Sequence, residues 1–264
     1  MTGGSAPENV APPEPVRRRA AEILVVLMVG VVPFLVASLV HVVNPPEDAA
    51  VRAFMAALLG EAYQPTSLDF ATKVAEHVAA SCAVIAAVLW IILRSSRGFA
   101  FFGFVPFKLI RDVGIGVCLY ALAQALYFGG GTLLATALFV VGYEVPTESP
   151  FESGAVATPA GYFALPLIVL LSLVNACAEQ LVMTGYLIPR LRELFRSRWL
   201  AVLAVTACFA TYHLYQGTWG VVNAASLGLV LSTYAVIARR WWPCFVAHVL
   251  ADFVPFTLAY LSQP

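Results

Sequence analysis

The sequence predicts an all-α fold, a polytopic membrane helix bundle of about seven transmembrane helices with a cytoplasmic N-terminus. Of the 264 residues, 61% are hydrophobic and 11% are charged, and the mean hydropathy is +0.85. Soluble domains have roughly 45–50% apolar and 25% charged residues, so this composition exceeds what a soluble core needs. The apolar residues form long runs, and only helices are expected because each satisfies its backbone hydrogen bonds internally.

Seven apolar runs are expected to cross the membrane, preceded by a basic, disordered tail at residues 1–20. In chain order the runs cover residues 22–44, 77–94, 113–141, 163–188, 199–215, 219–237 and 243–261. The first run is longer than the roughly 7–15 apolar residues of a signal peptide, which favours a retained span. The third run contains Gly129-Gly130-Gly131 and is expected to be tilted or broken there.

The distribution of charge sets the expected orientation. When the runs alternate across the bilayer, all of the 15 Lys and Arg except Arg52 and Lys73 fall on one side. Because cytoplasmic loops are enriched in Lys and Arg, the N-terminus is expected inside and the C-terminus outside. The chain is therefore expected to be a multi-pass protein of a cell membrane, and its Ala- and Arg-rich style favours a bacterial inner membrane.

Several other classes of function lack the features that they require. The sequence has no basic stripe for nucleic acid, no Gly-rich phosphate loop and no internal repeat. Its five cysteines form no C-x-x-C pair and lie in or beside apolar runs. They are expected to be small packing residues without disulfides.

Four ionisable residues remain inside the apolar runs: Glu179, His213, His248 and Asp252. Such a residue costs roughly 2.5–3.5 kcal/mol at mid-membrane, so a functional role is the first hypothesis. His248 and Asp252 share a helix face at i and i+4, Asn175 lies one turn before Glu179, and Phe209 one turn before His213. The other histidines, His41 and His77, are expected at the membrane interface.

These groups favour hydrolytic chemistry. A glutamate in an apolar site can act as a general base near neutral pH and take a proton from water held by a histidine. The resulting nucleophile could attack a peptide carbonyl while a histidine steadies the oxyanion. Purely structural contacts between helices, or a proton-coupled small transporter with a buried relay, are the alternatives from these residues alone.

Three short motifs carry a resemblance to a known family. The chain has "EQLVMTG" from Glu179, "FATYH" ending at His213 and "HVLAD" from His248, with "GYLIPRL" and "HLYQGTWG" as supporting sequence. In this order they resemble the CPBP intramembrane proteases, which include CaaX-protein endopeptidases and bacterial members linked to bacteriocin processing or immunity. The resemblance covers about residues 163–255. It implies a catalytic helix bundle over residues 161–264, after transmembrane helices and loops over residues 21–160.

The resemblance also implies a role for each polar residue. Glu179 would activate water, His213 would assist that water or the oxyanion, and His248 would belong to the same cluster. Asp252 stands where many family members have Asn. Since an ionised Asp cannot donate to an oxyanion, Asp252 is expected to orient His248 or to stay protonated.

The first motif departs from the family pattern twice. The usual second Glu is Gln180 and the usual Arg is Thr184, two positions that face each other at i and i+4. Losing one charge of a buried pair is costly, whereas replacing both by neutral groups can be nearly neutral. We therefore expect Gln180 and Thr184 to hydrogen-bond as a supporting pair while Glu179 is retained for chemistry.

The function hypothesis is an intramembrane endopeptidase whose partner is a membrane-anchored protein or peptide substrate. The alternative favoured by Gln180 and Thr184 is an inactive family member that acts in bacteriocin immunity or as a membrane partner. No obligatory cofactor is expected. If a divalent metal such as zinc is bound, Glu179, His213 and His248 are the expected ligands.

One mismatch in depth accompanies this hypothesis. Glu179 and Asp252 are expected about 14–15 Å from the cytoplasmic ends of their spans, and His213 about 21 Å from the end of its own. A single site therefore requires that the fifth run starts deeper or that the turn "YQGTWG" dips into the bundle.

Overall fold

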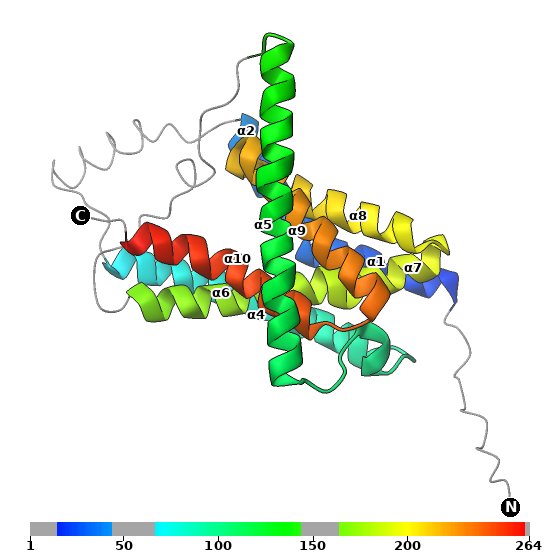
Figure 1. Cartoon of the computed structure of the whole chain (residues 1–264). Helices are drawn as coiled ribbons and strands as arrows, with labels where there is room; N and C mark the ends of the chain where they lie inside the picture. Colours follow the sequence, from blue (N-terminus) through cyan, green and yellow to red (C-terminus); the bar gives the residue numbers. More distant parts are fainter. Residues whose placement is uncertain (1–14, 44–66, 144–163, 262–264) are drawn as a thin grey trace, which may run out of the picture.

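The computed structural model describes residues 15–43, 67–143 and 164–261, and every regular element among these residues is a helix (Figure 1). This confirms the all-α prediction. In chain order the elements are α1 (Val16–Gly30), α2 (Val32–Val43), α4 (Ser67–Arg94), the 3₁₀ helix η1 (Phe99–Phe102), α5 (Leu109–Val140), α6 (Ala164–Gln180), the π-helix η2 (Leu181–Leu187), α7 (Ile188–Phe195), α8 (Arg198–Thr211), the 3₁₀ helix η3 (Leu214–Gln216), α9 (Gly217–Ala238) and α10 (Trp242–Leu261).

Within the described residues, four helical segments are long and apolar enough to cross a membrane. They are Val74–Arg94, Leu109–Val140, Leu165–Phe195 and Leu214–Ala238. Two further apolar helices, Arg198–Thr211 and Trp242–Leu258, are shorter. These segments make the chain a multi-pass membrane protein, while the count of seven spans and the cytoplasmic N-terminus stay predictions.

The start of the chain differs from its prediction. Helix α1 already includes residues 16–20, so the predicted disordered tail is wrong there, and residues 1–14 lie outside the described part of the chain. Side-chain contacts hold this first turn in place. Arg18 Nε donates to Glu22 Oε1 over 3.1 Å, and Arg18 Nη2 donates to the carbonyl oxygen of Arg94 over 3.0 Å.

The first apolar run is two helices instead of one span. Helix α1 ends at Gly30 and α2 begins at Val32, with the break just before Pro33, whose ring has no N–H to continue the backbone ladder. A Cβ placed on Gly30 would lie 2.8 Å from Cγ2 of Val182 in the π-helix. The glycine therefore lets α1 approach the centre of the bundle closely.

Helix α5 is unbroken through its three glycines, so the alternative of a break in this run is not found. Gly131 packs against the indole of Trp219, because a Cβ there would lie 3.2 Å from Trp219 Cζ3, whereas nothing lies within 4 Å of a Cβ at Gly129 or Gly130. Figure 1 shows α5 crossing the neighbouring helices and its C-terminal half projecting beyond them. Large apolar side chains such as Phe139, which is 76% exposed, cover this half, as lipid contact requires.

The segment α6–η2–α7 is the centre of the bundle. All seven residues of the π-helix η2 are buried, and η2 contacts α1, α4, α8 and α9. Upstream of it, α6 packs against α4 and α10. Wide π turns are frequent at functional sites, so the change of helix type directly after Gln180 makes this region a candidate functional site.

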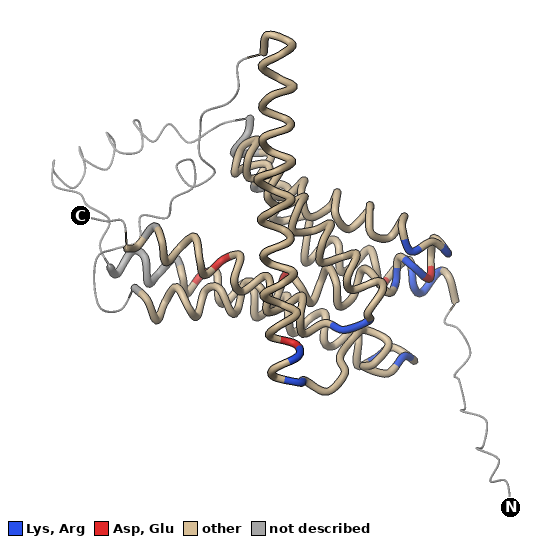
Figure 2. The backbone as a smooth tube through the Cα atoms, viewed as in Figure 1, with Lys and Arg blue, Asp and Glu red and all other residues tan. Residues whose placement is uncertain are grey.

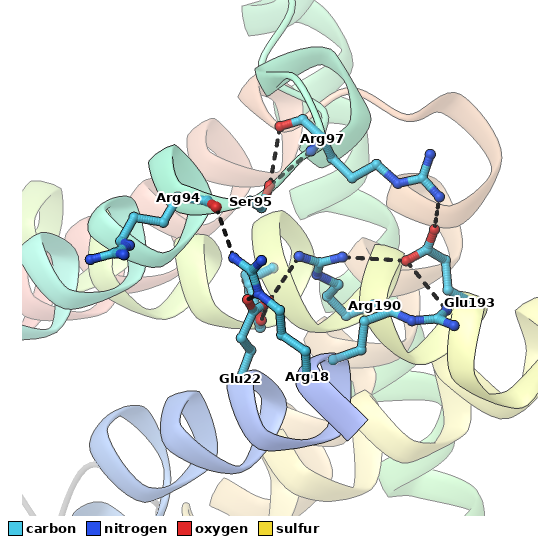
Figure 3. Close-up of polar contacts among 9 residues, drawn as sticks. Arg18, Glu22, Arg94, Ser95, Arg97, Arg190 and Glu193 are labelled. Carbon is cyan, nitrogen blue, oxygen red and sulfur yellow. Dashed lines mark hydrogen bonds and ion pairs between the residues drawn. The ribbon is translucent and has the colours of Figure 1, made fainter. Parts of the chain in front are cut away.

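Basic residues gather at one end of the bundle and at the start of α5 (Figure 2). At this end lies a buried ion-pair network, which we call the Arg190 cluster (Figure 3). Its charged members are Arg18, Arg19, Glu22, Arg97, Arg190 and Glu193. The Arg190 side chain is 0% exposed, with Nη2 at 2.9 Å from Glu22 Oε2 and Nη1 at 3.4 Å from Glu193 Oε2. The cluster joins α1, the segment after α4 and α7.

Candidate active site

The C-terminal end of α6 and the middle of α10 bring three of the predicted site residues, Glu179, His248 and Asp252, into contact. Glu179 Oε2 lies 3.4 Å from His248 Nε2, and the same nitrogen lies 3.7 Å from Asp252 Oδ1. His248 is 2% exposed. The i to i+4 spacing places His248 and Asp252 on the face of α10 that packs against α6, so Glu179 completes the group.

The two departures from the family motif form the expected hydrogen bond. Thr184 Oγ1 lies 2.9 Å from Gln180 Oε1, and Gln180 Nε2 lies 2.6 Å from His248 Nδ1. With the amide nitrogen facing it, Nδ1 of His248 is an acceptor and the proton of the neutral ring lies on Nε2. Thr184 and Gln180 thus direct an N–H of His248 toward Glu179.

A second chain of hydrogen bonds reaches the site from α4. His77 Nε2 lies 2.9 Å from Asn175 Oδ1, and Asn175 Nδ2 donates to Asp252 Oδ2 over 2.9 Å. Instead of a purely interfacial residue, His77 is the end of a relay that fixes Asn175 and, through it, Asp252. The side chain of His41 lies outside the described part of the chain.

His213 lies beside this group, and its ring and that of His248 both contact the Phe209 ring. The Phe209 ring centroid is 4.7 Å from that of His213 and 5.6 Å from that of His248. Nδ1 of His213 lies 2.8 Å from the Phe209 carbonyl oxygen, so Nδ1 carries the proton and Nε2 is left as an acceptor.

The length of α8 bears on the expected mismatch in depth. Its 14 residues span about 21 Å, less than the roughly 30 Å of a hydrocarbon core. His213 follows in the turn between α8 and η3, and Ser38 of α2 donates to the backbone carbonyl of the adjacent Tyr212. Tyr212 is buried, whereas Tyr215 in the turn "YQGTWG" is 39% exposed, so the depth of His213 relative to Glu179 in a membrane stays a prediction.

Tyr212 is a site residue that the sequence argument did not select. Its hydroxyl lies beside the Glu179 carboxylate, and Tyr212 is 3% exposed. Yet neither Tyr212 Oη nor Glu179 Oε2 has a hydrogen-bond partner of acceptable geometry among the described residues. Each of these two buried polar atoms thus keeps unused hydrogen-bonding capacity. The only available signal was the position of Tyr212 inside "FATYH".

The side chains that the structure describes contain no group of three His, Cys, Asp or Glu close enough to hold a metal ion. Glu179 and His248 are adjacent, but Nδ1 of His213 is committed to a backbone carbonyl and Nδ1 of His248 to Gln180. Hydrogen bonds at Nδ1 leave Nε2 of each ring as the atom that would hold a metal. Whether Glu179, His213 and His248 bind a divalent metal stays a prediction.

Comparison with known proteins gives a match over the part of the chain that contains this site. Residues 161–254 match the family model described as Rce1-like, type II CAAX prenyl endopeptidase Rce1-like. No match was found among curated proteins or among solved structures. The matched residues include all three motifs and leave out α1 to α5. The family resemblance predicted from the motifs is thereby confirmed: residues 161–254 are similar to Rce1-like type II CAAX prenyl endopeptidases, as expected of a CPBP protease.

Proposed function

We propose that this protein is an intramembrane endopeptidase that hydrolyses a peptide bond in a membrane-anchored protein or peptide. The observation that carries the proposal is the buried Glu179 Oε2, which faces His248 Nε2 and has no hydrogen-bond partner among the described residues. An acid kept in this state at the centre of a membrane bundle is costly, and a role in chemistry accounts for it. The name of the matched family makes prenylated CaaX tails one candidate substrate class.

Glu179 is the general base in the first step. A water molecule next to Oε2 gives one proton to the carboxylate, and its oxygen attacks the carbonyl carbon of the scissile bond. His213 Nε2, an acceptor in its tautomer, holds the second hydrogen of the water and orients it. This assigns His213 to the water in preference to the oxyanion.

Two donors face the developing oxyanion. His248 carries its proton on Nε2 because Gln180 faces Nδ1, and the Tyr212 hydroxyl has no acceptor of acceptable geometry among the described residues. Both can donate to the carbonyl oxygen as it becomes negative. Asp252, held by Asn175, orients the His248 ring and takes no proton from the substrate.

Collapse of the tetrahedral intermediate completes the reaction. The C–N bond breaks, and Glu179 returns its proton to the leaving nitrogen, which departs as an amine. The new C-terminus departs as a carboxylic acid, which ionises in water. Glu179 is thus regenerated as a carboxylate, and no group beyond water is consumed.

Replacement of the base tests the proposal. In cells that carry Glu179→Ala, uncleaved membrane proteins should accumulate, while the variant itself inserts and reaches the level of the parent. Quantitative proteomics of the membrane fraction would identify these proteins and supply a substrate. If the variant cleaves as well as the parent, the proposal fails. If Glu179, His213 and His248 can all be replaced with no loss of phenotype, the non-enzymatic partner role is the better account.

A further inference from the structure

A cavity of about 280 Å³ opens at the arginine-rich end of the bundle, distinct from the group around Glu179. It is lined by η1, α7, the end of α9 and the turn between α9 and α10, with apolar walls that include Phe101, Ile188 and Trp241. Its volume is below the roughly 300–1,000 Å³ of sites for drug-sized ligands. It can therefore take a small head group but not a whole lipid.

The cavity carries positive charge that no residue described by the structure neutralises. Of its three arginines, Arg240 is paired with Asp112, at 2.7 Å from Nη2 to Oδ2. The side chains of Arg192 and Arg239 make no hydrogen bond or ion pair with any residue that the structure describes. The carboxylate of the lining, Glu193, is already held by arginines of the Arg190 cluster. Two guanidinium groups are thus left for a ligand.

One residue of the same lining, Trp241, has a buried side-chain donor. Trp241 is 5% exposed, and its Nε1 has no acceptor among the residues of known placement. The neighbouring Cδ1 lies 3.3 Å from a Cβ placed on Gly185, so this edge of the indole faces the π-helix next to Thr184, which also lines the cavity. An unpaired buried N–H costs free energy that an oxygen acceptor would recover.

The cavity lies where a membrane helix meets the head groups. Arg239 follows directly on the apolar segment Leu214–Ala238, and Ile237 just before it is 62% exposed. Arginine and tryptophan at the end of a span are typical of the bilayer interface. A ligand here can have its charged group in the cavity and its apolar chains along the outer surface of α9.

We propose that this cavity binds the phosphate of an anionic phospholipid head group, with Arg192 and Arg239 paired to the phosphate and Trp241 Nε1 donating to one of its oxygens. Free phosphate shares this chemistry but lacks the chains that would hold it at the interface. The site is independent of the proposed hydrolysis. Because Thr184 lines the cavity and also bonds Gln180, the bound lipid would lie next to the residues that orient His248.

Binding can be measured without a protease substrate. The full chain, purified in detergent, would be titrated with phosphatidylglycerol and phosphatidylcholine, and lipid adducts would be counted by native mass spectrometry. The test variant is Arg192→Gln with Arg239→Gln. The matched control is Arg17→Gln with Arg196→Gln, which also removes two positive charges at this end of the bundle. Arg196, like Arg239, is at a helix terminus and has a positive φ. Thermal unfolding without lipid checks that all variants are folded.

We expect phosphatidylglycerol to bind the parent and the control alike, and the test variant roughly 30-fold more weakly, as about 1 kcal/mol per arginine implies. Trp241→Phe should weaken binding several-fold. Equal affinity of the test and control variants, or of the two lipids, would overturn the site. If millimolar inorganic phosphate displaces no lipid from the parent and adds no adduct, the lipid source is supported. If phosphate alone binds the cavity and phosphatidylglycerol does not, the lipid source is refuted.

Discussion

The segment α6–η2–α7 contributes to two buried polar groups, one around Glu179 and the other around Arg190. The two groups differ in whether each charge has a partner of opposite charge. Where the end of α6 meets α10, Glu179 of α6 and Asp252 of α10 both contact His248. Neither acid pairs with a Lys or Arg among the described residues. At α7, the fully buried Arg190 has Glu22 and Glu193 as partners, and these acids have further arginines around them. One group is rich in acceptors, whereas the other is an interlocked set of opposite charges.

The difference separates a role in chemistry from a role in structure. A matched ion pair can be buried because each charge compensates the other, and removal of one partner leaves the other stranded. Acids without cations gain no such compensation, so their retention indicates a function. We therefore expect variants of the Arg190 cluster to change stability and variants of the Glu179 group to change activity.

The largest expected effect on stability is at Arg190. Arg190→Met should lower the free energy of unfolding by about 3–5 kcal/mol, because Glu22 and Glu193 lose a buried partner. Guanidinium or SDS unfolding in detergent, followed by tryptophan fluorescence, would measure it, with Arg196→Met as the exposed control. Glu179→Gln should leave this free energy unchanged or raise it. A Glu179→Gln variant as unstable as Arg190→Met would remove the distinction between the two groups.

A smaller effect is expected at the hydroxyl that orients Gln180. Thr184→Val should lower kcat for a substrate identified in the Glu179→Ala strain about tenfold, the equivalent of roughly one hydrogen bond, with KM nearly unchanged. Thr184→Ser keeps the hydroxyl and should remain close to the parent. Equal activity of the Val and Ser variants would show that Gln180 needs no help to direct the His248 ring.

The smallest effect is expected at the far end of the relay. His77→Ala should lower kcat about threefold, since Asn175 can still donate to Asp252 but is held less firmly. His77→Gln, which can donate to Asn175 Oδ1, should recover most of this loss. A double-mutant cycle with Asn175→Ala would detect coupling between the two positions. Additive losses would mean that His77 does not act through Asn175.

Local spacing made part of the site predictable. His248 and Asp252 share a face whatever the rest of the fold does, and Gln180 and Thr184 meet for the same reason. Apolar runs likewise predicted the helices, because the length of a run and the length of a span are set by the same bilayer. Matching Glu179 to His248 needed the order of the motifs as well, since it joins α6 to α10.

Contacts made across the fold were not predictable in this way. His77 reaches Asn175 only because α4 packs against α6, and no pattern in either helix encodes that neighbour. The contact of Tyr212 with Glu179 depends on where α8 ends. At the start of α1, Arg18 contacts Glu22 and the carbonyl oxygen of Arg94. Composition does not encode the contact with Arg94, and it therefore predicted a tail for these residues.

The π-helix between Glu179 and Arg190 also sets the angle around the helix axis between these two side chains. Its seven residues change the angular register of the helix, so that Glu179 faces α10 while Arg190, further along, faces α1. One residue corresponds to about 100° of rotation around an α-helix. Deletion of a single residue from Leu181–Leu187 would therefore turn one group away from its partners whenever the other stays in place. The spacing between Glu179 and Arg190 is in this sense a fixed angle as well as a fixed length.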